Sequence, residues 1–420
     1  MNSKNIDVSI LCITYNHEAY IRDALEGILH QDIDYNYEVI VHDDASTDKT
    51  PQIIREYENK YPDKIRCIYQ KENQYSAGGA KRILTQVFNL CRGRYIALCE
   101  GDDFWIDDHK LKIQLDWMEK HTDYFMTAHN ALRMDYTQNT LRTINPYTQE
   151  KEICPEELIM QYNGNLPTAS IVIRDDIRNI EPFFWDCGIG DVPMQLYSMM
   201  KGRIYYFDRI MSVYRHNHCG SWCVDTLGID KEKVIIHYAK MIRFAHEYDS
   251  YTSKRFSIYL HELTLNCLAS ILYQCKDFSV SEFRYKIQML LDKQEESLRE
   301  YLCDIAEAYE QFYSENYISA KIRDFIDRYQ RLYIWGTGNF GTKLAQKFKG
   351  NDIGYAGFVI SDEVEMDKEY MERPVYHISD VKNTVEDISI IVAVNRSLWR
   401  KLRHQLEDQS NIKYCYMLSI

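Results

Sequence analysis

Short apolar runs alternate with amphipathic stretches over the first hundred residues of the chain. The apolar runs predict buried strands at Val8–Ile13, Tyr37–Val41, Ile65–Tyr69 and Tyr95–Cys99. The stretches between them repeat apolar residues at helical spacing and predict helices over residues 21–29, 50–61 and about 80–91. Strands that alternate with helices favour a parallel sheet covered by helices. We therefore predict an α/β fold for this part of the chain.

Carboxylates follow two of these strands directly. Asp43 and Asp44 end the second strand, and Glu100, Asp102 and Asp103 end the fourth. Ligands of open α/β sheets bind beyond the carboxyl ends of the strands, which is where both acidic clusters lie. Acids this close repel one another unless a cation lies between them, and a divalent cation shared with substrate phosphates suits such oxygen ligands. A solvated turn whose acids cap the next helix is the alternative for the second cluster.

Residues 8 to about 222 resemble the family 2 glycosyltransferases, which have the GT-A fold. The resemblance rests on four segments, in this order: VSILCITYNHEAYIRDALEGIL, YEVIVHDDASTDKT, GRYIALCEGDDFW and GDVPMQL. It implies an inverting enzyme that takes a sugar from a nucleotide-diphosphate donor, expected to be UDP-linked, with Mn²⁺ or Mg²⁺ as cofactor. It also implies a role in building a surface or capsular polysaccharide on a glycan or lipid-linked glycan acceptor.

The same resemblance assigns roles to residues at the strand ends. It implies a nucleotide-sugar site that includes Thr14, Tyr15, Asn16, Asp43, Asp44 and Asp102. Asp103 would hold the metal ion, and Asp102 would contact the ribose or the metal. Position 101 is Gly, a departure from a strict acidic triplet, so the role of Glu100 stays open. His216 and His218 lie in a segment that resembles one folding over the donor site. They are candidate metal ligands or phosphate contacts, with surface loop residues as the alternative.

Asp191 precedes a helical run and matches the acidic position that supplies the catalytic base in this family. An inverting transfer needs one carboxylate to deprotonate the acceptor hydroxyl opposite the leaving group. Because Asp is also a favoured N-cap residue, helix capping is the alternative. The pair Gly78–Gly79 is predicted to open a helix whose free N–H groups, together with Lys81, bind the diphosphate. An ordinary glycine turn is the alternative there.

The rest of the chain predicts two further parts. Residues 223–328 have a wholly helical pattern without proline and are interpreted as a connector. In residues 329–420 a strand precedes G-x-G-x-x-G at Gly336, Gly338 and Gly341, and Asp362 ends the next strand, as in a dinucleotide-binding fingerprint. We predict a small Rossmann-like domain whose glycines serve either a bound nucleotide or close packing. The predicted domains are therefore residues 1–222, 223–328 and 329–420.

Composition and charge exclude other classes of function. Lys and Arg number 50 against 63 Asp and Glu, and the net charge of −13 argues against nucleic-acid binding by bulk electrostatics. The polar N-terminus and the lack of any run of 18 apolar residues predict a cytoplasmic protein, at most peripheral at the inner face of the plasma membrane. The 12 cysteines form no C-x-x-C pair and are expected to be reduced.

Two other classes of function and the oligomeric state stay open. A nucleotidyltransferase would need a loop rich in Gly, Lys and Arg after the first strand, where this chain has Tyr15-Asn16-His17-Glu18. A non-catalytic protein that senses a dinucleotide through residues 332–420 would not need Asp43, Asp44, Asp102, Asp103 and Asp191, which are all present. The sequence does not distinguish a monomer from a homo-oligomer.

Overall fold

The computed structural model describes residues 5–144, 147–160, 166–218, 230–314, 317–328, 331–383, 387–393, 406 and 411–416. The chain divides into two compact units, residues 1–263 and 264–420, which are described separately. The three predicted domains stay a prediction, and residues 222 and 329, at their limits, lie outside the described residues.

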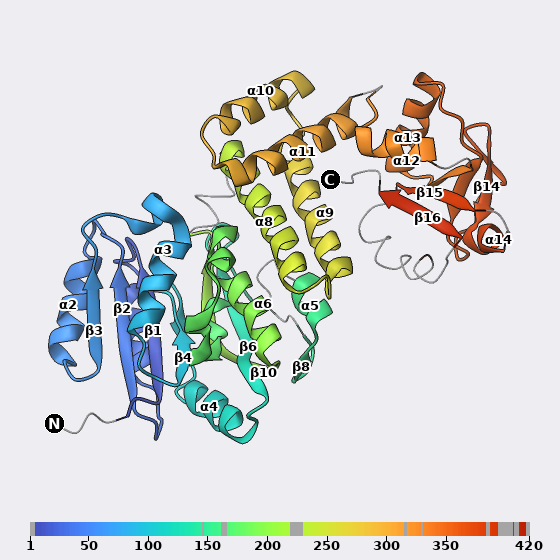
Figure 1. Cartoon of the computed structure of the whole chain (residues 1–420). Coiled ribbons are helices and arrows are strands. Elements are labelled where there is room, and N and C mark those ends of the chain that lie inside the picture. Colours follow the sequence, from blue (N-terminus) through green and yellow to red (C-terminus); the bar gives the residue numbers. More distant parts are fainter. Residues whose placement is uncertain are drawn as a thin grey trace. The chain divides into compact units, whose positions relative to one another are not determined.

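Four parallel strands form one half of the sheet in the first unit (Figure 1). They lie side by side in the order β3 (Ile65–Tyr69), β2 (Tyr37–Asp43), β1 (Val8–Thr14) and β4 (Tyr95–Leu98). The connecting helices are α1 (Ile21–Leu29), α2 (Thr50–Lys60) and α3 (Gln74–Leu90). Apolar side chains at helical spacing hold α1 on the sheet, where Ile21, Leu25 and Ile28 are fully buried. The predicted α/β fold is confirmed.

Helix α3 begins at Gln74, earlier than its predicted start near residue 80. Asn73 accepts a hydrogen bond from the Ser76 N–H at 2.7 Å, and the Asp44 carboxylate accepts the N–H groups of Gln74 and Tyr75 at 2.7 and 2.9 Å. These acceptors satisfy the free N–H groups of the first turn and offset the low helix propensity of Gly78–Gly79. The two glycines therefore lie inside the helix, so the prediction that they open it and offer free N–H groups to the diphosphate is wrong.

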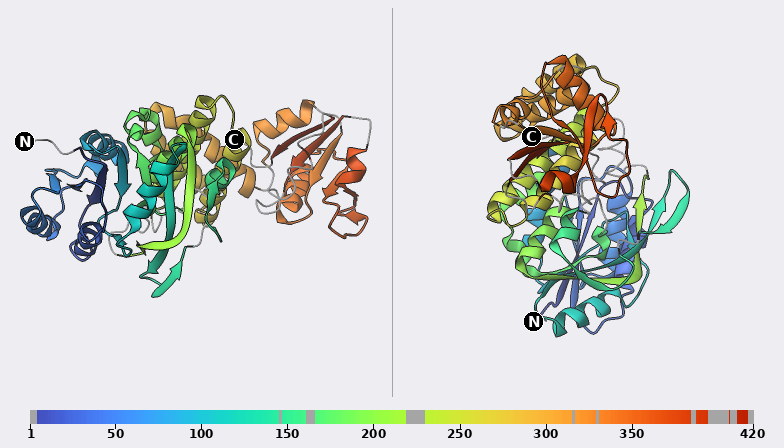
Figure 2. Two further views of the ribbon diagram at one scale, coloured as in Figure 1. Left: turned by 90° about the horizontal axis from the view of Figure 1, so that it is seen from below. Right: turned by 90° about the vertical axis from the view of Figure 1, so that its right-hand side faces the viewer.

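The other half of the sheet carries the longest strands. It continues from β4 with β9 (Val172–Arg174), β6 (Tyr124–Asp135), β10 (Arg203–His216) and β5 (Phe104–Trp105). The parallel pair of β6 and β10 is visible in Figure 2. The sequence predicts two strands where β10 is one, because register shifts around Phe207 and Ile210 bend the strand without ending it.

Shorter elements complete this unit. They are α4 (Lys110–Lys120), β7 (Thr140–Thr143), β8 (Lys151–Ile153), α5 (Pro155–Met160), η1 (Thr168–Ser170), η2 (Asp175–Asn179), η3 (Pro182–Cys187), α6 (Asp191–Lys201) and α8 (Lys231–Tyr251). The polar stretch 137–155 contains β7 and β8, which pair with β6 and β10. The 3₁₀ turn η1 directly precedes the short strand β9.

Helix α9 (Ser257–Gln274) starts in the first unit and ends in the second, where α10 (Val280–Leu291), α11 (Glu296–Tyr313) and α12 (Ala320–Arg328) follow. The predicted helical middle is confirmed.

A smaller sheet follows in the order β13 (Glu369–Tyr370), β14 (Arg373–His377), β12 (Gly357–Ile360), β11 (Leu332–Trp335), β15 (Ile388–Val392) and β16 (Ile412–Tyr416). All its neighbours are parallel except β13 and β14, and its helices are α13 (Asn339–Gly350) and α14 (Ile378–Lys382). Among the described residues, no helix is both long and apolar enough to cross a bilayer.

Candidate functional site

The loops after β1 and β4 pack directly on each other at the carboxyl edge of the sheet. The Gly101 N–H donates to the Ile13 carbonyl at 2.9 Å. A Cβ at position 101 would lie 2.5 Å from Oγ1 of Thr14 and 3.0 Å from Nδ1 of His17. Glycine is therefore the residue that fits between Glu100 and Asp102, which explains why the acidic triplet is interrupted there.

Asp103 has one carboxylate oxygen ready for a cation. Its Oδ1 accepts the backbone N–H of Arg215 at 2.9 Å. Its Oδ2 is buried and has no hydrogen-bond partner among the described residues. Burial, Asp102 and Glu100 together raise the pKa of Asp103 well above its usual range. A buried carboxylate oxygen without a partner is costly unless a cation binds it, so this site fits the implied divalent metal.

Asp102 lies between two histidines. Its Oδ2 is 3.0 Å from Nε2 of His218 and 3.8 Å from Nε2 of His17. Burial opposes the ionisation of Asp102, but the two histidines outweigh it and the pKa of Asp102 is lowered. Nδ1 of His17 contacts Oγ1 of Thr14 at 3.1 Å, which orients the ring. Sequence reasoning missed His17, although it directly follows the Thr14-Tyr15-Asn16 segment.

The two predicted histidine ligands have different surroundings. The structure brings His218 to Asp102 and packs its ring 4.7 Å from that of Tyr20. His216 instead contacts the Asp135 carboxylate at 3.2 Å and the Arg133 guanidinium at 2.7 Å. Because Asn217 has a left-handed backbone with a φ of 59°, the alternation of side chains along β10 ends between the two histidines. Only His218 belongs to the carboxylate cluster.

Asp191 lies at the first position of α6, and Gly190 is the N-cap. The alternative that Asp191 is the N-cap residue is therefore wrong. Its Oδ1 accepts the N–H of Val192 at 2.9 Å. Burial raises the pKa of Asp191. Burial, Asp102 and then Asp191 raise the pKa of Glu100 to about 8. The charges of Asp102 and Asp191 thus both act on Glu100, which links the candidate base to the acids that follow β4.

The predicted nucleotide residues fall into two groups. Tyr15, directly after β1, is 41% exposed. Asp43, whose pKa is raised by burial, interacts with Ser46, whose backbone N–H lies a long 3.4 Å from its Oδ1. Asn16 and Asp44 have structural partners, because Asn16 accepts the Thr47 N–H at 2.8 Å and Asp44 accepts two N–H groups of α3. Tyr15 and Asp43 are thus better placed than Asn16 and Asp44 to contact a nucleotide.

Lys81, a predicted diphosphate contact, forms an ion pair with Asp186. Its Nζ lies 2.8 Å from Oδ1 of Asp186, and this ion pair joins α3 to η3. Its side chain is 44% exposed, so the ion pair is a weak constraint that a diphosphate could exchange for its own oxygens.

Lys110 is a second residue that sequence reasoning missed. Its side chain is fully buried under Trp105, with Nζ 4.0 Å from the centre of the ring and no hydrogen-bond partner among the described residues. Burial lowers the pKa of Lys110 to about 7. Nothing in the sequence marks it, since a lysine at the start of an amphipathic helix is normally solvated.

The sequence profile of the family Glycosyl transferase family 2 matches residues 9–171. UDP-Glc:alpha-D-GlcNAc-diphosphoundecaprenol beta-1,3-glucosyltransferase WfaP of Escherichia coli is 32% identical over 239 residues, which are 56% of this chain and 85% of that protein. The chain belongs to glycosyltransferase family 2.

Two further relatives and one solved structure are also similar to the chain. The putative teichuronic acid biosynthesis glycosyltransferase TuaG of Bacillus subtilis is 34% identical over 131 residues, 31% of this chain and 49% of that protein. An uncharacterized protein of Mycobacterium tuberculosis is 33% identical over 222 residues, 51% of this chain, and the match spans only 60% of that relative. The structure of S. aureus TarS 1–349 with UDP-GlcNAc aligns with a TM-score of 0.44 and 14% identity, over 73% of this chain and 92% of that one.

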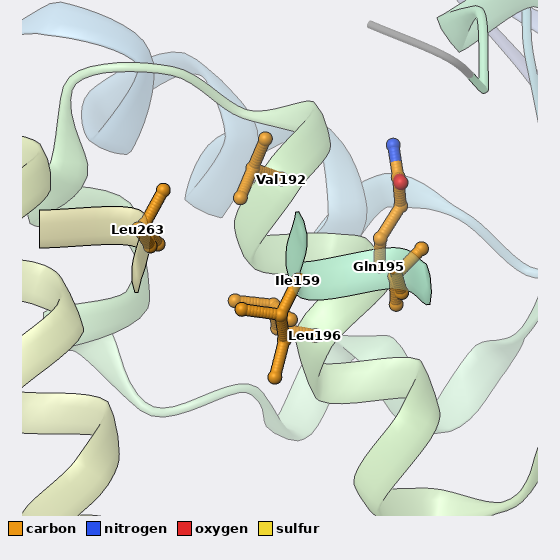
Figure 3. A pocket seen from close by; sticks show the side chains of 6 residues that line it. Ile159, Val192, Gln195, Leu196 and Leu263 are labelled. Atoms are coloured by element: carbon orange, nitrogen blue, oxygen red, sulfur yellow. The ribbon is translucent and has the colours of Figure 1, made fainter. Parts of the chain in front are cut away.

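The side of α6 that faces α5 and α9 is apolar. Leu158 and Ile159 of α5, Leu263 of α9, and Val192, Gln195 and Leu196 of α6 line a small cleft (Figure 3). The cleft is packed too tightly to admit a water molecule. It therefore supports the helix that carries Asp191 and offers no room for a ligand.

The glycine-rich turn of the second unit lies outside the match to the family profile. A Cβ at Gly341 would lie 1.8 Å from the Gly336 carbonyl oxygen, so close packing explains this glycine, whereas a Cβ at Gly338 would meet nothing within 4 Å. Asp362 accepts the Ser379 N–H at 3.0 Å at the start of α14. Gly341 and Asp362 thus have structural roles, and nucleotide binding by this unit stays a prediction.

Proposed function

We propose that the chain is an inverting, metal-dependent glycosyltransferase that moves a sugar from a UDP-linked donor to a hydroxyl group of a glycan or lipid-linked glycan. The observation that carries this proposal is the buried Oδ2 of Asp103 beside Asp102, which has no hydrogen-bond partner among the described residues, together with the effect of Asp191 on the neighbouring Glu100. Family membership and the E. coli relative, whose name gives a diphosphoundecaprenol-linked sugar as acceptor, support it.

Asp103, Asp102 and His218 would hold Mn²⁺ or Mg²⁺. No three His, Cys, Asp or Glu side chains among the described residues form a ready metal cage, so the donor diphosphate would complete the coordination. When bound, the ion supplies a Lewis acid that stabilises the charge developing on the leaving diphosphate. Tyr15 would stack on the base, and Asp43 would accept a hydrogen bond from the nucleotide.

Asp191 would act as the general base. Its carboxylate lies at the start of α6, close enough to raise the pKa of Glu100. In an in-line displacement it accepts the proton of the acceptor hydroxyl while the glycosidic bond forms on the face opposite the departing nucleotide. Burial raises the pKa of Asp191, which makes it a stronger base than an exposed aspartate.

The proposal is tested by calorimetric titration of UDP and GDP, with and without Mn²⁺, on the wild type, Asp103→Asn and the control Asp63→Asn. Asp63 is an exposed aspartate outside the site. We expect UDP binding that requires Mn²⁺ in the wild type and the control and is lost in Asp103→Asn. No binding of either nucleotide to the wild type, together with binding of NAD, would overturn the proposal and favour a dinucleotide-sensing protein.

A further inference from the structure

Arg215 joins the two carboxylate positions of the site to helix α1. Its side chain is 6% exposed. One terminal nitrogen, Nη1, donates to the backbone carbonyl of Asp102 at 2.7 Å, and the other, Nη2, donates to the carboxylate of Asp23. The backbone N–H of the same residue donates to Oδ1 of Asp103 at 2.9 Å.

Two aromatic rings hold the guanidinium in place. Its central carbon lies 5.0 Å from the centre of the Tyr20 ring and 4.3 Å from that of Phe104. Tyr20 also packs on His218, the residue that contacts Asp102. A planar, delocalised cation suits this place between rings, and the compact ammonium of lysine does not.

The contacts of Arg215 leave the candidate ligand atoms uncovered. The guanidinium binds the carbonyl of Asp102 and the distant acid Asp23, rather than a side-chain oxygen of Asp102 or Asp103. Its charge nevertheless lowers the pKa of Asp103, against the larger opposing effects of burial and of the neighbouring acids. The backbone bond to Oδ1 fixes the carboxylate rotamer and leaves Oδ2 for another partner.

We infer that Arg215 is a positioning residue, which holds the loop of Asp102 and Asp103 in the geometry that binds the metal ion and does not itself touch it. This inference rests on the proposed function, because it gives a role toward the metal of that site. It adds that the end of β10, more than 100 residues away in the sequence, contributes to how well the two carboxylates bind the cation.

The first test compares Arg215→Lys and Arg215→Met with Arg203→Met. Arg203 begins the same strand β10 and pairs with the exposed acids Asp123 and Glu152, so it controls for the loss of a charged side chain from this strand. Mn²⁺ binding is measured by electron paramagnetic resonance in the presence of UDP, and kcat and KM by release of UDP from the donor. Thermal unfolding reports whether each variant folds.

For both Arg215 variants we expect Mn²⁺ affinity and kcat to fall by about 10- to 100-fold, the range typical of residues that orient metal ligands. We expect KM for the donor at saturating Mn²⁺ to change less than about threefold, because the nucleotide contacts remain. Lysine should not rescue, since it cannot bridge Asp102 and Asp23 between two rings. Arg203→Met should behave as the wild type.

A second variant, Asp23→Asn, tests the inference even if Arg215→Met does not fold. Asp23→Asn removes the outer anchor, whose side chain is 54% exposed, and leaves the bonds of Arg215 to residues 102 and 103. We expect a smaller loss of Mn²⁺ affinity, about two- to fivefold, because the exposed carboxylate of Asp23 holds the guanidinium weakly, whereas its bond to the Asp102 carbonyl remains.

The possible outcomes separate this inference from the proposed function. Folded Arg215→Met with wild-type Mn²⁺ affinity and kcat would overturn the role of Arg215 and leave the proposed function standing. If Arg215→Met does not fold, unchanged Mn²⁺ affinity in Arg215→Lys and in Asp23→Asn would overturn it instead. A wild type that binds neither Mn²⁺ nor UDP would overturn the proposed function, and the inference with it.

Discussion

Nε2 of His218 lies 3.0 Å from Oδ2 of Asp102, and a second histidine, His17, approaches the same oxygen at 3.8 Å. The contact joins the end of β10 to the loop after β4. A neutral imidazole and a carboxylate are both metal ligands. His218 and Asp102 are therefore close enough to bind the same cation in place of their contact with each other.

Replacing His218 should weaken metal binding, whereas replacing His216 should not. We expect His218→Gln to lose about 10- to 100-fold in Mn²⁺ affinity, as for other residues that hold or orient a metal. His216→Gln is the matched control, since its ring contacts Asp135 and Arg133 instead. Titration of Mn²⁺ in the presence of UDP measures both. Equal losses in the two variants would contradict the assignment.

Asp191→Asn should lower kcat and spare donor binding. Removing a general base typically costs about 10²- to 10⁴-fold in rate, whereas the donor contacts lie on other elements. Release of UDP measures kcat, and calorimetry measures UDP affinity in the presence of Mn²⁺. Asp186→Asn, five positions earlier and paired with Lys81, is the control and should keep most of the activity. Loss of UDP binding in Asp191→Asn would show that Asp191 acts on the donor side.

The acid limb of kcat should lie above the pH at which an exposed aspartate titrates. The base must be ionised to accept a proton, and burial raises the pKa of Asp191, so kcat falls as the pH is lowered through that raised pKa. Measurement of kcat from about pH 3.5 to 8, with folding followed in parallel, tests this against an ordinary aspartate near pH 4. An acid limb at or below about pH 4 in the folded protein would contradict it.

Lys110 should make stability depend on pH above neutrality. Its folded-state pKa is about 7, below the ordinary lysine value of 10.5, so between these values the unfolded chain binds more protons. The free energy of unfolding then rises with pH by up to about 1.4 kcal/mol per unit, and below this window the penalty is fully present. The contact with the Trp105 ring favours the charged amine and so narrows the pH range over which stability depends on Lys110.

Lys110→Met removes this titration, so the variant should gain most over the wild type near pH 6.5 and least near pH 9.5. Denaturant unfolding at several pH values measures the difference. Lys120→Met, at the exposed end of the same helix, is the control and should leave the pH slope unchanged. The same slope in wild type and Lys110→Met would show that Lys110 stays protonated in the fold.

The fold and the acids of the site could be predicted because both follow from local patterns. The runs at β1 and β4 are apolar, and the carboxylates follow where the chain leaves the sheet. The partner of each side chain could not be predicted in the same way. Asp44 and Asn16 look like ligand-binding residues in the sequence, but their partners are N–H groups of α3 and of Thr47.

Contacts between distant segments account for the other differences. The start of α3 depends on Asp44, thirty residues earlier, which outweighs the low helix propensity of two glycines. The choice between His216 and His218 depends on the left-handed backbone of Asn217, which periodicity does not reveal. Arg215 gains its role only when β10 lies next to β5 and the loop after β4.

Helix α6 and strand β10 follow each other with only Gly202 between them. Asp191 is the first residue of the helix, and Arg215 is the residue before the last of the strand. One continuous segment therefore carries both the candidate base and the residue whose N–H binds Asp103. The distance between the candidate base and the candidate metal ligands therefore depends on the length of this segment, which acts as a spacer. An insertion of one residue in β10 would shift its pairing with β6 and change that separation, whereas an insertion in the exposed β6–β7 turn would leave it intact.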